Sequence, residues 1–195
     1  MGEVIVLSPP KVETVNVEVI GTSPLICRNW SQTQKDLMLA KQTKRACKAR
    51  EAKKPERDYE ESLYRHPQGG YGFPAVAFKA AAVRAGTYAE MKMTFLRGAF
   101  HVSGEMVKLN GEPSMREDMV RLNGKVADIR YRGQFAEWSA VVPIQVNVSV
   151  LSIEQLANLL VIAGFAVGVG EWRPEKNGQY GRFEIGSIQV GRVAA

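Results

Sequence analysis

Apolar and polar residues alternate in several stretches of the chain, which is the pattern of a β-strand with one buried face. Val15, Val17 and Val19 share one face of the first stretch, with polar residues between them. A branched apolar side chain at every second position favours a strand over a helix. The predicted strands are residues 12–20, 95–102, 144–150 and 182–190.

Two helices are predicted from the residues at their ends. Residues 74–85 carry a proline in the first turn, and Gly86 follows directly after the last turn. This segment is apolar nearly all round, so we expect it to pack against a sheet. Ser152 and Gln155 have the spacing of a capping box, which predicts a helix from residue 153 to about residue 165.

The order strand, helix, strand, strand, helix, strand is that of an α+β ferredoxin-like domain, β-α-β-β-α-β, and we expect residues 1–195 to form one such domain. Two connections are much longer than the few residues that are usual in a compact domain. Residues 28–72 are predicted to hold a basic helical insertion. Residues 105–132 are predicted to form a β-hairpin arm, because Asn110-Gly111 and Asn123-Gly124 both favour tight turns.

The positive charge of the chain is concentrated in one segment. The net charge is +6, and residues 35–54 contain eight lysines and arginines against Asp36 and Glu51, so this segment holds the whole excess. Its composition favours a helix that ends at Pro55. A charge so localised indicates a polyanionic partner. The alternative is a helix face that is simply solvated.

Residues 168–183, GVGEWRPEKNGQYGRF, form a glycine-rich loop directly before the last strand. Glycine permits a positive φ and a close approach of another backbone, and Arg173, Lys176 and Arg182 add cations. Such a loop can hold a phosphodiester backbone. It lacks the lysine pattern of a Walker A loop and does not open a helix as a dinucleotide-binding loop does. The alternative is a purely structural turn.

In this order of elements, the last helix is followed by GxG, further glycines and GRF before the final strand. This combination resembles the RAMP superfamily of CRISPR-associated RNA-binding proteins, most closely its backbone subunits. The resemblance spans residues 12–190, with the specific motif at residues 167–183. It implies that the loop contacts RNA, that the hairpin arm acts as a thumb, and that copies coat a guide RNA as a filament. A stand-alone relative from a phage or mobile element, binding single-stranded DNA or RNA, is another form of this hypothesis. The candidate nucleic-acid-binding residues are Arg28, Lys35, Lys41, Lys44, Arg45, Lys48, Arg50, Lys53, Lys54, Arg97, Arg130, Arg132, Gly168, Gly170, Trp172, Arg173, Lys176, Gly178, Gly181 and Arg182.

Aromatic residues lie among these cations. Trp30 accompanies the basic insertion, Trp172 and Tyr180 lie in the glycine-rich loop, and Tyr131 stands between Arg130 and Arg132. Alternating aromatic and basic side chains suit single strands, whose bases are unstacked. We therefore expect a protein that binds single-stranded RNA or DNA without strong sequence preference and oligomerises along it.

Two other functions remain open. A metal-independent endoribonuclease of the same superfamily would use His66 or His101 as a general base. A protein-interaction module, such as an inhibitor that imitates a CRISPR subunit, would use the basic helix to bind an acidic protein. We expect no enzymatic activity, metal or cofactor. No window is long and apolar enough to span a membrane and the N-terminus does not resemble a secretory signal, which predicts a cytoplasmic protein.

Overall fold

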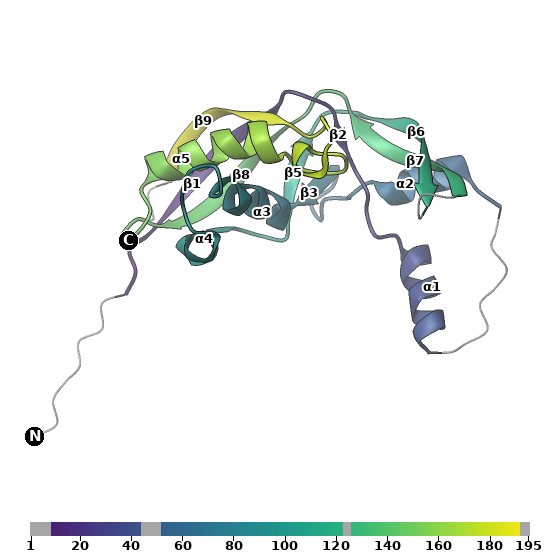
Figure 1. Cartoon of the computed structure of the whole chain (residues 1–195), viewed down its shortest axis with the longest axis horizontal. Coiled ribbons are helices and arrows are strands. Elements are labelled where there is room, and N and C mark those ends of the chain that lie inside the picture. The colour runs from purple at the N-terminus through teal and green to yellow at the C-terminus, as the bar shows by residue number, and fades with distance from the viewer. Residues whose placement is uncertain (1–8, 44–51, 123–125, 192–195) are drawn as a thin grey trace, which may run out of the picture.

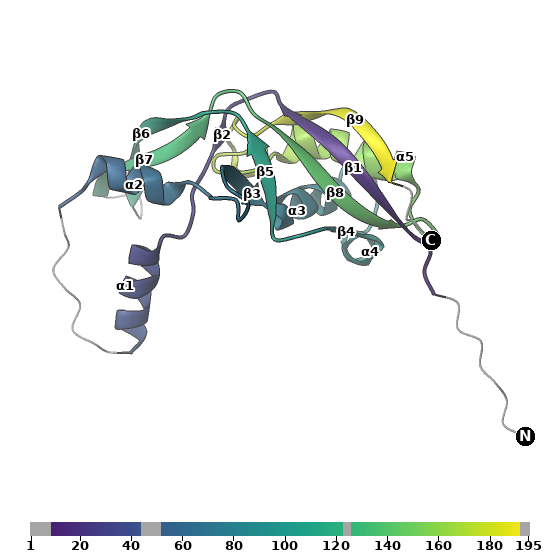
Figure 2. The same cartoon turned by 180° about the vertical axis from the view of Figure 1, so that it is seen from behind.

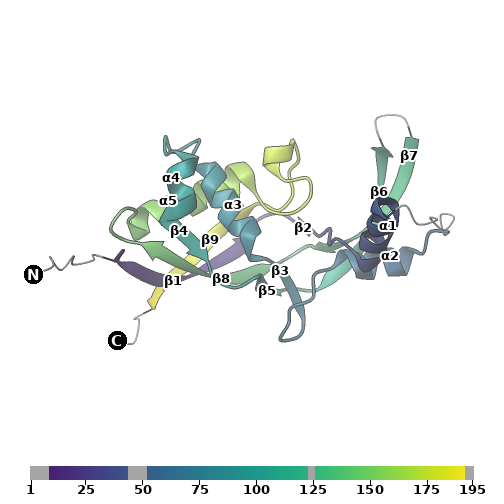
Figure 3. The ribbon, with the colours of Figure 1, turned by 90° about the horizontal axis from the view of Figure 1, so that it is seen from below.

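An antiparallel sheet with helices on one face forms the body of the molecule. The computed structural model describes residues 9–43, 52–122 and 126–191. Strands follow the order β3-β5-β8-β1-β9, and β4 pairs with β8. Figure 3 shows α3 and α5 on the same face of this sheet. The elements are β1 (Val12–Gly21), β3 (Tyr71–Pro74), β4 (Phe100–Val102), β5 (Met106–Asn110), β8 (Ser139–Asn147), β9 (Phe183–Gly191), α3 (Ala75–Ala85) and α5 (Ile153–Ile162).

The predicted α+β class is confirmed, and the strand order is that of a ferredoxin-like core. Strand β1 lies between β8 and β9 and is antiparallel to both. Val15, Val17 and Val19 are fully buried beneath the helices, as their alternation predicts. Phe78 and most alanines of α3 are also buried, because small side chains let this helix lie close to the sheet.

Figure 2 shows the opposite face of the sheet, which α3 and α5 leave uncovered. Glu18 of β1 accepts a hydrogen bond from the Ser187 hydroxyl at 2.9 Å. Thr14 and Asn16 lie on the same side of β1 and are partly exposed. Strand β1 contains no aromatic residue, so it provides no stacking platform on this face.

The prediction of a strand over residues 95–102 is mostly wrong. Helix α4 (Met93–Ala99) occupies its first part, and only β4 is extended. Leu96 and Ala99 are buried and Phe100 follows, a spacing of three to four residues that fits a helix. The second core strand is instead shared between β4 and β5, both paired with β8.

The hairpin consists of β6 (Pro113–Leu122) and β7 (Val126–Phe135), which pair along their whole length. The short strand β2 (Leu25–Ile26) joins β7 in a second sheet. Gly111, at φ +128°, turns the chain from β5 into β6, so the Asn110-Gly111 turn leads into the hairpin and does not lie at its tip. Figure 1 shows β6 and β7 extending beyond the main sheet. Asn123-Gly124 lies outside the described residues.

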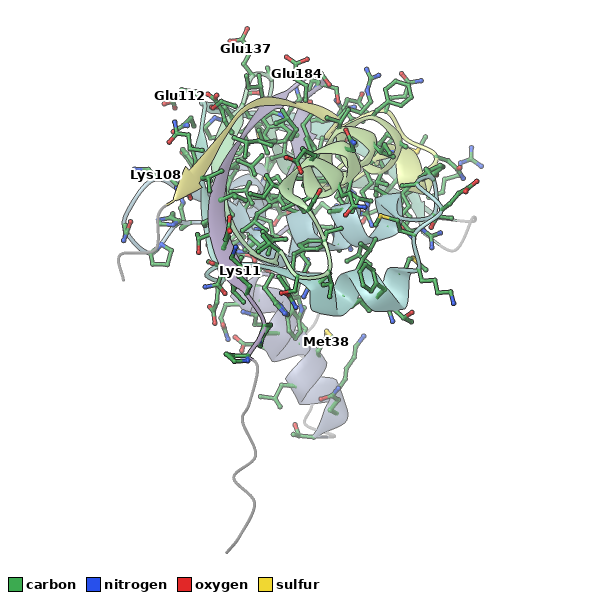
Figure 4. All side chains as sticks on the ribbon, turned by 90° about the vertical axis from the view of Figure 1, so that its left-hand side faces the viewer. Lys11, Met38, Lys108, Glu112, Glu137 and Glu184 are labelled. Atoms are coloured by element: carbon green, nitrogen blue, oxygen red, sulfur yellow. The ribbon has the colours of Figure 1, made fainter. Side chains whose placement is uncertain are left out.

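The basic segment contains two helices, α1 (Gln32–Gln42) and α2 (Pro55–Ser62). Pro55 begins α2, where its missing N–H needs no partner, and does not end a longer helix. Helix α2 packs on β7, and the Gly133 N–H donates to the Ser62 hydroxyl at 2.7 Å. Helix α1 buries no residue and points away from the body, as the position of Met38 in Figure 4 shows.

The capping box of α5 is present, since Ser152 and Gln155 each bond the other's backbone N–H. After Ile162 the helix widens into a π-turn (Ala163–Val167), followed by the loop and a 3-10 turn (Pro174–Lys176). A Cβ on Gly164 would lie 1.9 Å from the Phe183 carbonyl oxygen. This close contact fixes the loop directly beside the start of β9. Among the described residues, no helix is long and apolar enough to cross a membrane.

Candidate nucleic-acid interface

The glycine-rich loop is bound along the connection between β1 and β2. The Gly181 N–H donates to the Pro24 carbonyl at 2.8 Å, and the Glu171 N–H donates to the Ile26 carbonyl at 3.1 Å. The Arg182 N–H donates to the Ser23 hydroxyl at 2.9 Å. The loop therefore has a defined conformation although it contains no long helix or strand.

The predicted loop glycines serve this conformation. Gly168, Gly170 and Gly181 adopt positive φ values of 69°, 82° and 64°. Gly178 has no such φ but lies so close to Trp172 that a Cβ would be 1.7 Å from its carbonyl oxygen. The glycines are needed for the fold of the loop, and the side chains around them provide its chemistry.

Two aromatic rings of the loop lie against the hairpin. Trp172 and Tyr180 have ring centroids 6.1 Å apart. The guanidinium of Arg116, on β6, lies 4.7 Å from the centre of the Tyr180 ring and 5.5 Å from that of Trp172. Arg132, on β7, lies 4.9 Å from the Trp172 ring. These cation–π contacts join the arm to the loop, which rise on the same side of the molecule in Figure 3.

Charged residues form a cluster on the inner face of the hairpin. Arg116 pairs across the strands with Arg132, and Asp118 with Arg130. The Arg116 Nε donates to Asp118 at 2.8 Å, while the Arg132 Nη1 lies 3.7 Å from the other carboxylate oxygen and makes no hydrogen bond to the described part of the chain. Asp118 and Arg132 are both buried.

The charged groups of this cluster are partly shielded from solvent. Burial lowers the pKa of Arg132 from its ordinary value, and the charges of Glu171 and Asp118 act against that shift. Burial also acts to lower the pKa of Arg116, but its hydrogen bonds to Asp118 and Tyr180 outweigh this and the pKa is raised. Both guanidinium groups remain cationic at neutral pH.

An open pocket of about 600 Å³ lies beside the two rings. Lys176 is exposed at this pocket, and Arg182 is half-buried with an Nε that has no hydrogen-bond partner among the described residues. Neither side chain forms an ion pair within the described ranges. The pocket is lined by Ser23, Pro24, Trp172, Lys176, Asn177, Gly178, Gln179, Tyr180 and Arg182.

Besides Arg132, four of the predicted cations contact carboxylates. Arg173 makes a bidentate contact with Glu175 and also donates to the Gly170 carbonyl. Arg28 lies 3.7 Å from Glu171. Lys53 and Arg130 both contact Asp128, at 2.7 and 3.1 Å. These pairs connect the loop, the basic segment and the arm.

The remaining predicted cations that the structure describes are not brought to the loop. Lys35 and Lys41 lie on α1, and Lys35 stands over the Trp30 ring at 5.4 Å. Lys54 precedes α2 and is exposed. Arg97 lies on α4, at the other end of the sheet from the hairpin (Figure 1). Lys44, Arg45, Lys48 and Arg50 lie outside the described residues.

Arg116 is absent from the predicted set although it contacts both loop rings. A two-residue Asn-Gly turn at 123–124 would place Arg116 opposite Tyr131. The structure pairs Leu122 with Val126, so three residues separate the strands and Arg116 faces Arg132 instead. A shift of one residue changes the face on which a strand side chain lies. Tyr180 is among the aromatic residues that the sequence singles out, but spacing along the chain does not indicate its partner.

Each histidine ring has a described group within hydrogen-bond distance. The Nδ1 atom of His66 accepts the Gln68 N–H at 3.2 Å within its own turn. The Nδ1 atom of His101 lies 2.9 Å from the Lys79 ammonium. Within residues 9–43, 52–122 and 126–191, no cluster of three or more metal-binding side chains occurs.

Comparisons with known proteins identify the fold. No family model and no curated protein matches the chain. Its structure is similar to a chain in the cryo-EM structure of the type III-B Cmr-beta bound to cognate target RNA, with a TM-score of 0.56 and 11% sequence identity. The match covers 92% of this chain and 61% of that chain, so the present chain spans about three-fifths of its length. The crystal structure of Cmr6 from Pyrococcus furiosus matches with a TM-score of 0.48 and 10% identity over 90% of this chain and 99% of that one.

The fold that the sequence resemblance implies is thereby confirmed, since the chain shares its fold with the chain of the Cmr-beta structure. The molecule is an α+β protein with a ferredoxin-like core, and its glycine-rich loop is bound between that core and a basic hairpin arm.

Proposed function

We propose that this protein binds single-stranded nucleic acid at the junction between the glycine-rich loop and the hairpin arm. The observation that carries the proposal is the pocket beside this junction, which is lined by the loop and by Ser23 and Pro24. There Lys176 and Arg182, which form no ion pair with a described residue, lie beside the Trp172 and Tyr180 rings that contact the arm. Cations neutralise phosphates and aromatic rings stack on bases of any identity. The site therefore suits a single strand, and the role that we propose for it is binding without catalysis.

The shared fold supports this proposal, because the similar Cmr-beta structure was determined bound to cognate target RNA. On our proposal the arm acts as the thumb and Arg116 and Arg132 hold the loop against it. The exposed Lys35, Lys41 and Lys54 extend the positive surface along the basic segment. Phosphate contacts dominate this arrangement, so we expect weak sequence preference.

Replacing Lys176 and Arg182 by glutamine should weaken binding of a labelled 20-nucleotide strand by about tenfold or more at moderate salt, because two charge-assisted contacts are lost. The slope of log affinity against log salt should decrease by roughly 1.4, since each phosphate contact on a single strand contributes about 0.7. Fluorescence anisotropy at several salt concentrations measures both quantities.

The matched control is Lys11→Gln with Lys92→Gln, which removes the same charge directly before β1 and α4. Figure 1 shows α4 far from the hairpin, and Figure 4 shows Lys11 at the lower end of β1. We expect this control to retain the wild-type affinity within about twofold. Equal losses in both double variants would show that only total charge matters. No binding of RNA or DNA by the wild type would favour a protein-interaction module.

We further propose that copies assemble side by side along the strand as backbone-type subunits. Helix α1 supports this, because it buries no residue of its own and exposes Leu37, Met38 and Leu39. Exposed apolar side chains gathered on one projecting element are typical of an interaction surface. A second copy is the partner that the RAMP resemblance implies.

Changing Leu37 and Leu39 to aspartate should prevent this assembly while leaving the fold of the body intact. Light scattering with a 60-nucleotide strand should give particles of several copies for the wild type and mainly smaller complexes for the variant. The control is Val76→Asp, which changes a residue 67% exposed on α3. Particles of equal mass from all three proteins would exclude α1 as the contact.

A further inference from the structure

The pocket beside Trp172 has a shape that a flat phosphate-binding surface does not need. A strand that is held only by its backbone can lie on an open row of cations. Here the 3-10 turn and the residues up to Arg182 enclose a concave space of about 600 Å³ against Ser23 and Pro24. Sites for small organic ligands commonly have volumes of about 300–1,000 Å³.

The lining of the pocket combines three kinds of chemistry. Trp172 and Tyr180 supply aromatic surface, Asn177 and Gln179 supply side-chain amides, and Lys176 and Arg182 supply cations. Aromatic rings and amides are the groups that proteins use for the face and the edge of an unstacked base. A nearby pair of cations fits a phosphate. One nucleotide contains all the complementary groups.

The backbone of the pocket is strained at its aromatic wall. Trp172 has φ +51°, a left-handed conformation that is unfavourable for a bulky residue. Its carbonyl accepts the Tyr180 N–H at 3.1 Å, and its ring lies against Arg132. Strain of this kind persists where surrounding contacts enforce it, and such positions cluster at ligand sites. The contacts that enforce it here set the orientation of the ring.

Arg182 adds an unsatisfied donor at the same place. Its Nε is buried and lacks a hydrogen-bond partner in the described part of the chain, although its backbone N–H is bonded to Ser23. A buried donor left without a partner is costly. Because Arg182 itself lines the pocket, its guanidinium group can contact a phosphate bound there. The exposed Lys176 lies on the same pocket and can contact the same group.

We propose that this pocket binds a single nucleotide, with the base against the Trp172 and Tyr180 wall and the 5′-phosphate at Lys176 and Arg182. The inference rests on the proposed function in that it gives one nucleotide of the bound strand a defined subsite. The same chemistry also fits a free nucleoside 5′-monophosphate, and the experiment separates the two sources.

Calorimetry or ligand-detected NMR with uridine, adenosine and their 5′-monophosphates tests this subsite directly. For the wild type we expect saturable binding of the monophosphates and weaker binding of the nucleosides. Lys176→Gln should weaken the monophosphates about tenfold and change nucleoside binding less than twofold, because only the phosphate contact is lost. Lys92→Gln, the matched control, should change neither.

A second variant separates the aromatic contribution. Tyr180→Leu should weaken nucleosides and monophosphates alike by about fivefold or more, since it removes the stacking surface. Because Tyr180 also contacts Arg116, the melting curve of the Tyr180→Leu variant is measured as well, to detect a loss of stability. If Lys176→Gln weakens nucleosides and monophosphates equally, or if no monophosphate binds the wild type, the subsite is wrong.

Competition with a labelled 20-nucleotide strand identifies the source of the nucleotide. Displacement of the strand by a monophosphate supports a subsite used by the strand, and simultaneous binding supports a free nucleotide. A strand that binds with Lys176-dependent affinity, while no monophosphate binds, overturns the subsite and leaves the proposed function standing. Monophosphate binding without strand binding would overturn the proposed function and leave the nucleotide pocket standing.

Discussion

Gly181→Ala is expected to destabilise the protein by about 4 kcal/mol, because two costs are added at one position. Gly181 has φ +64°, and an added Cβ would lie 1.7 Å from the Val169 carbonyl oxygen. Val169 is held by its own hydrogen bond to Gly181 at 2.9 Å, so neither backbone can move away freely. In a chain of this length the melting temperature should fall by roughly 10 °C. Thermal unfolding followed by circular dichroism measures the loss.

Two other glycines provide the controls for this variant. Gly69 has φ +91° but no described atom within 4 Å of the position that a Cβ would take, so Gly69→Ala tests the conformational cost alone, about 1 kcal/mol. Gly98 lies in α4 with open space around it, and Gly98→Ala should raise stability by about 0.5–1 kcal/mol. If Gly181→Ala and Gly69→Ala have the same melting temperature, the close contact with Val169 adds no cost and this prediction is wrong.

The binding consequence of Gly181→Ala should accompany its effect on stability. The residue donates to Pro24 at 2.8 Å and so holds the loop beside the pocket. Displacing this loop disturbs the pocket that Lys176, Arg182 and the two rings line. We expect the affinity for a single strand to fall by about tenfold or more even at temperatures where the body stays folded.

Arg132→Met should also have a large effect, about 3 kcal/mol of stability, because it leaves Asp118 buried without its opposite charge on β7. Arg132 has a side chain only 7% exposed and also covers the Trp172 ring. Arg116 still bonds one oxygen of Asp118, which keeps the cost at the lower end of the range for a broken buried pair. Chemical denaturation gives the change in the free energy of unfolding.

The double variant Arg132→Met with Asp118→Leu distinguishes an uncompensated charge from lost packing. Replacing a buried ion pair by apolar residues is often close to neutral, so the double variant should recover much of the stability. Arg116 keeps its hydrogen bond to Gln134 at 2.8 Å in this background. A double variant less stable than Arg132→Met would show that Asp118 acts mainly through Arg116.

Much of the core can be predicted because its signals are local. The alternation of Val15, Val17 and Val19 identifies β1, and the Ser152–Gln155 capping box identifies the start of α5. Helix α4 escapes prediction because seven residues are too short for a helical period to stand out from an alternating one. Pro55 is ambiguous because a proline is compatible with both the end of one helix and the first turn of the next.

The candidate site can be predicted only in part. Composition identifies the glycine-rich loop and Trp172, whereas the position of Arg116 depends on the register of the hairpin. Arg173 is a cation of the loop that proves to be held by Glu175, two residues away. Lys53 contacts Asp128, a partner from the arm that no spacing along the chain indicates. Arg130, which shares Asp128, lies two residues from it on the same strand.

Local sequence patterns are sufficient to specify most of the core elements in order, the location of the charge and the position of the glycine-rich loop. These features depend on backbone preferences and side-chain periodicity within a few residues. Contacts such as Lys53 with Asp128 and Arg116 with the Tyr180 ring are decided only in the folded chain, because they join residues that are distant in the sequence. Folding places Lys176 and Arg182 beside Trp172 and Tyr180, while Arg173, Lys53 and Arg130 stabilise the loop and the arm.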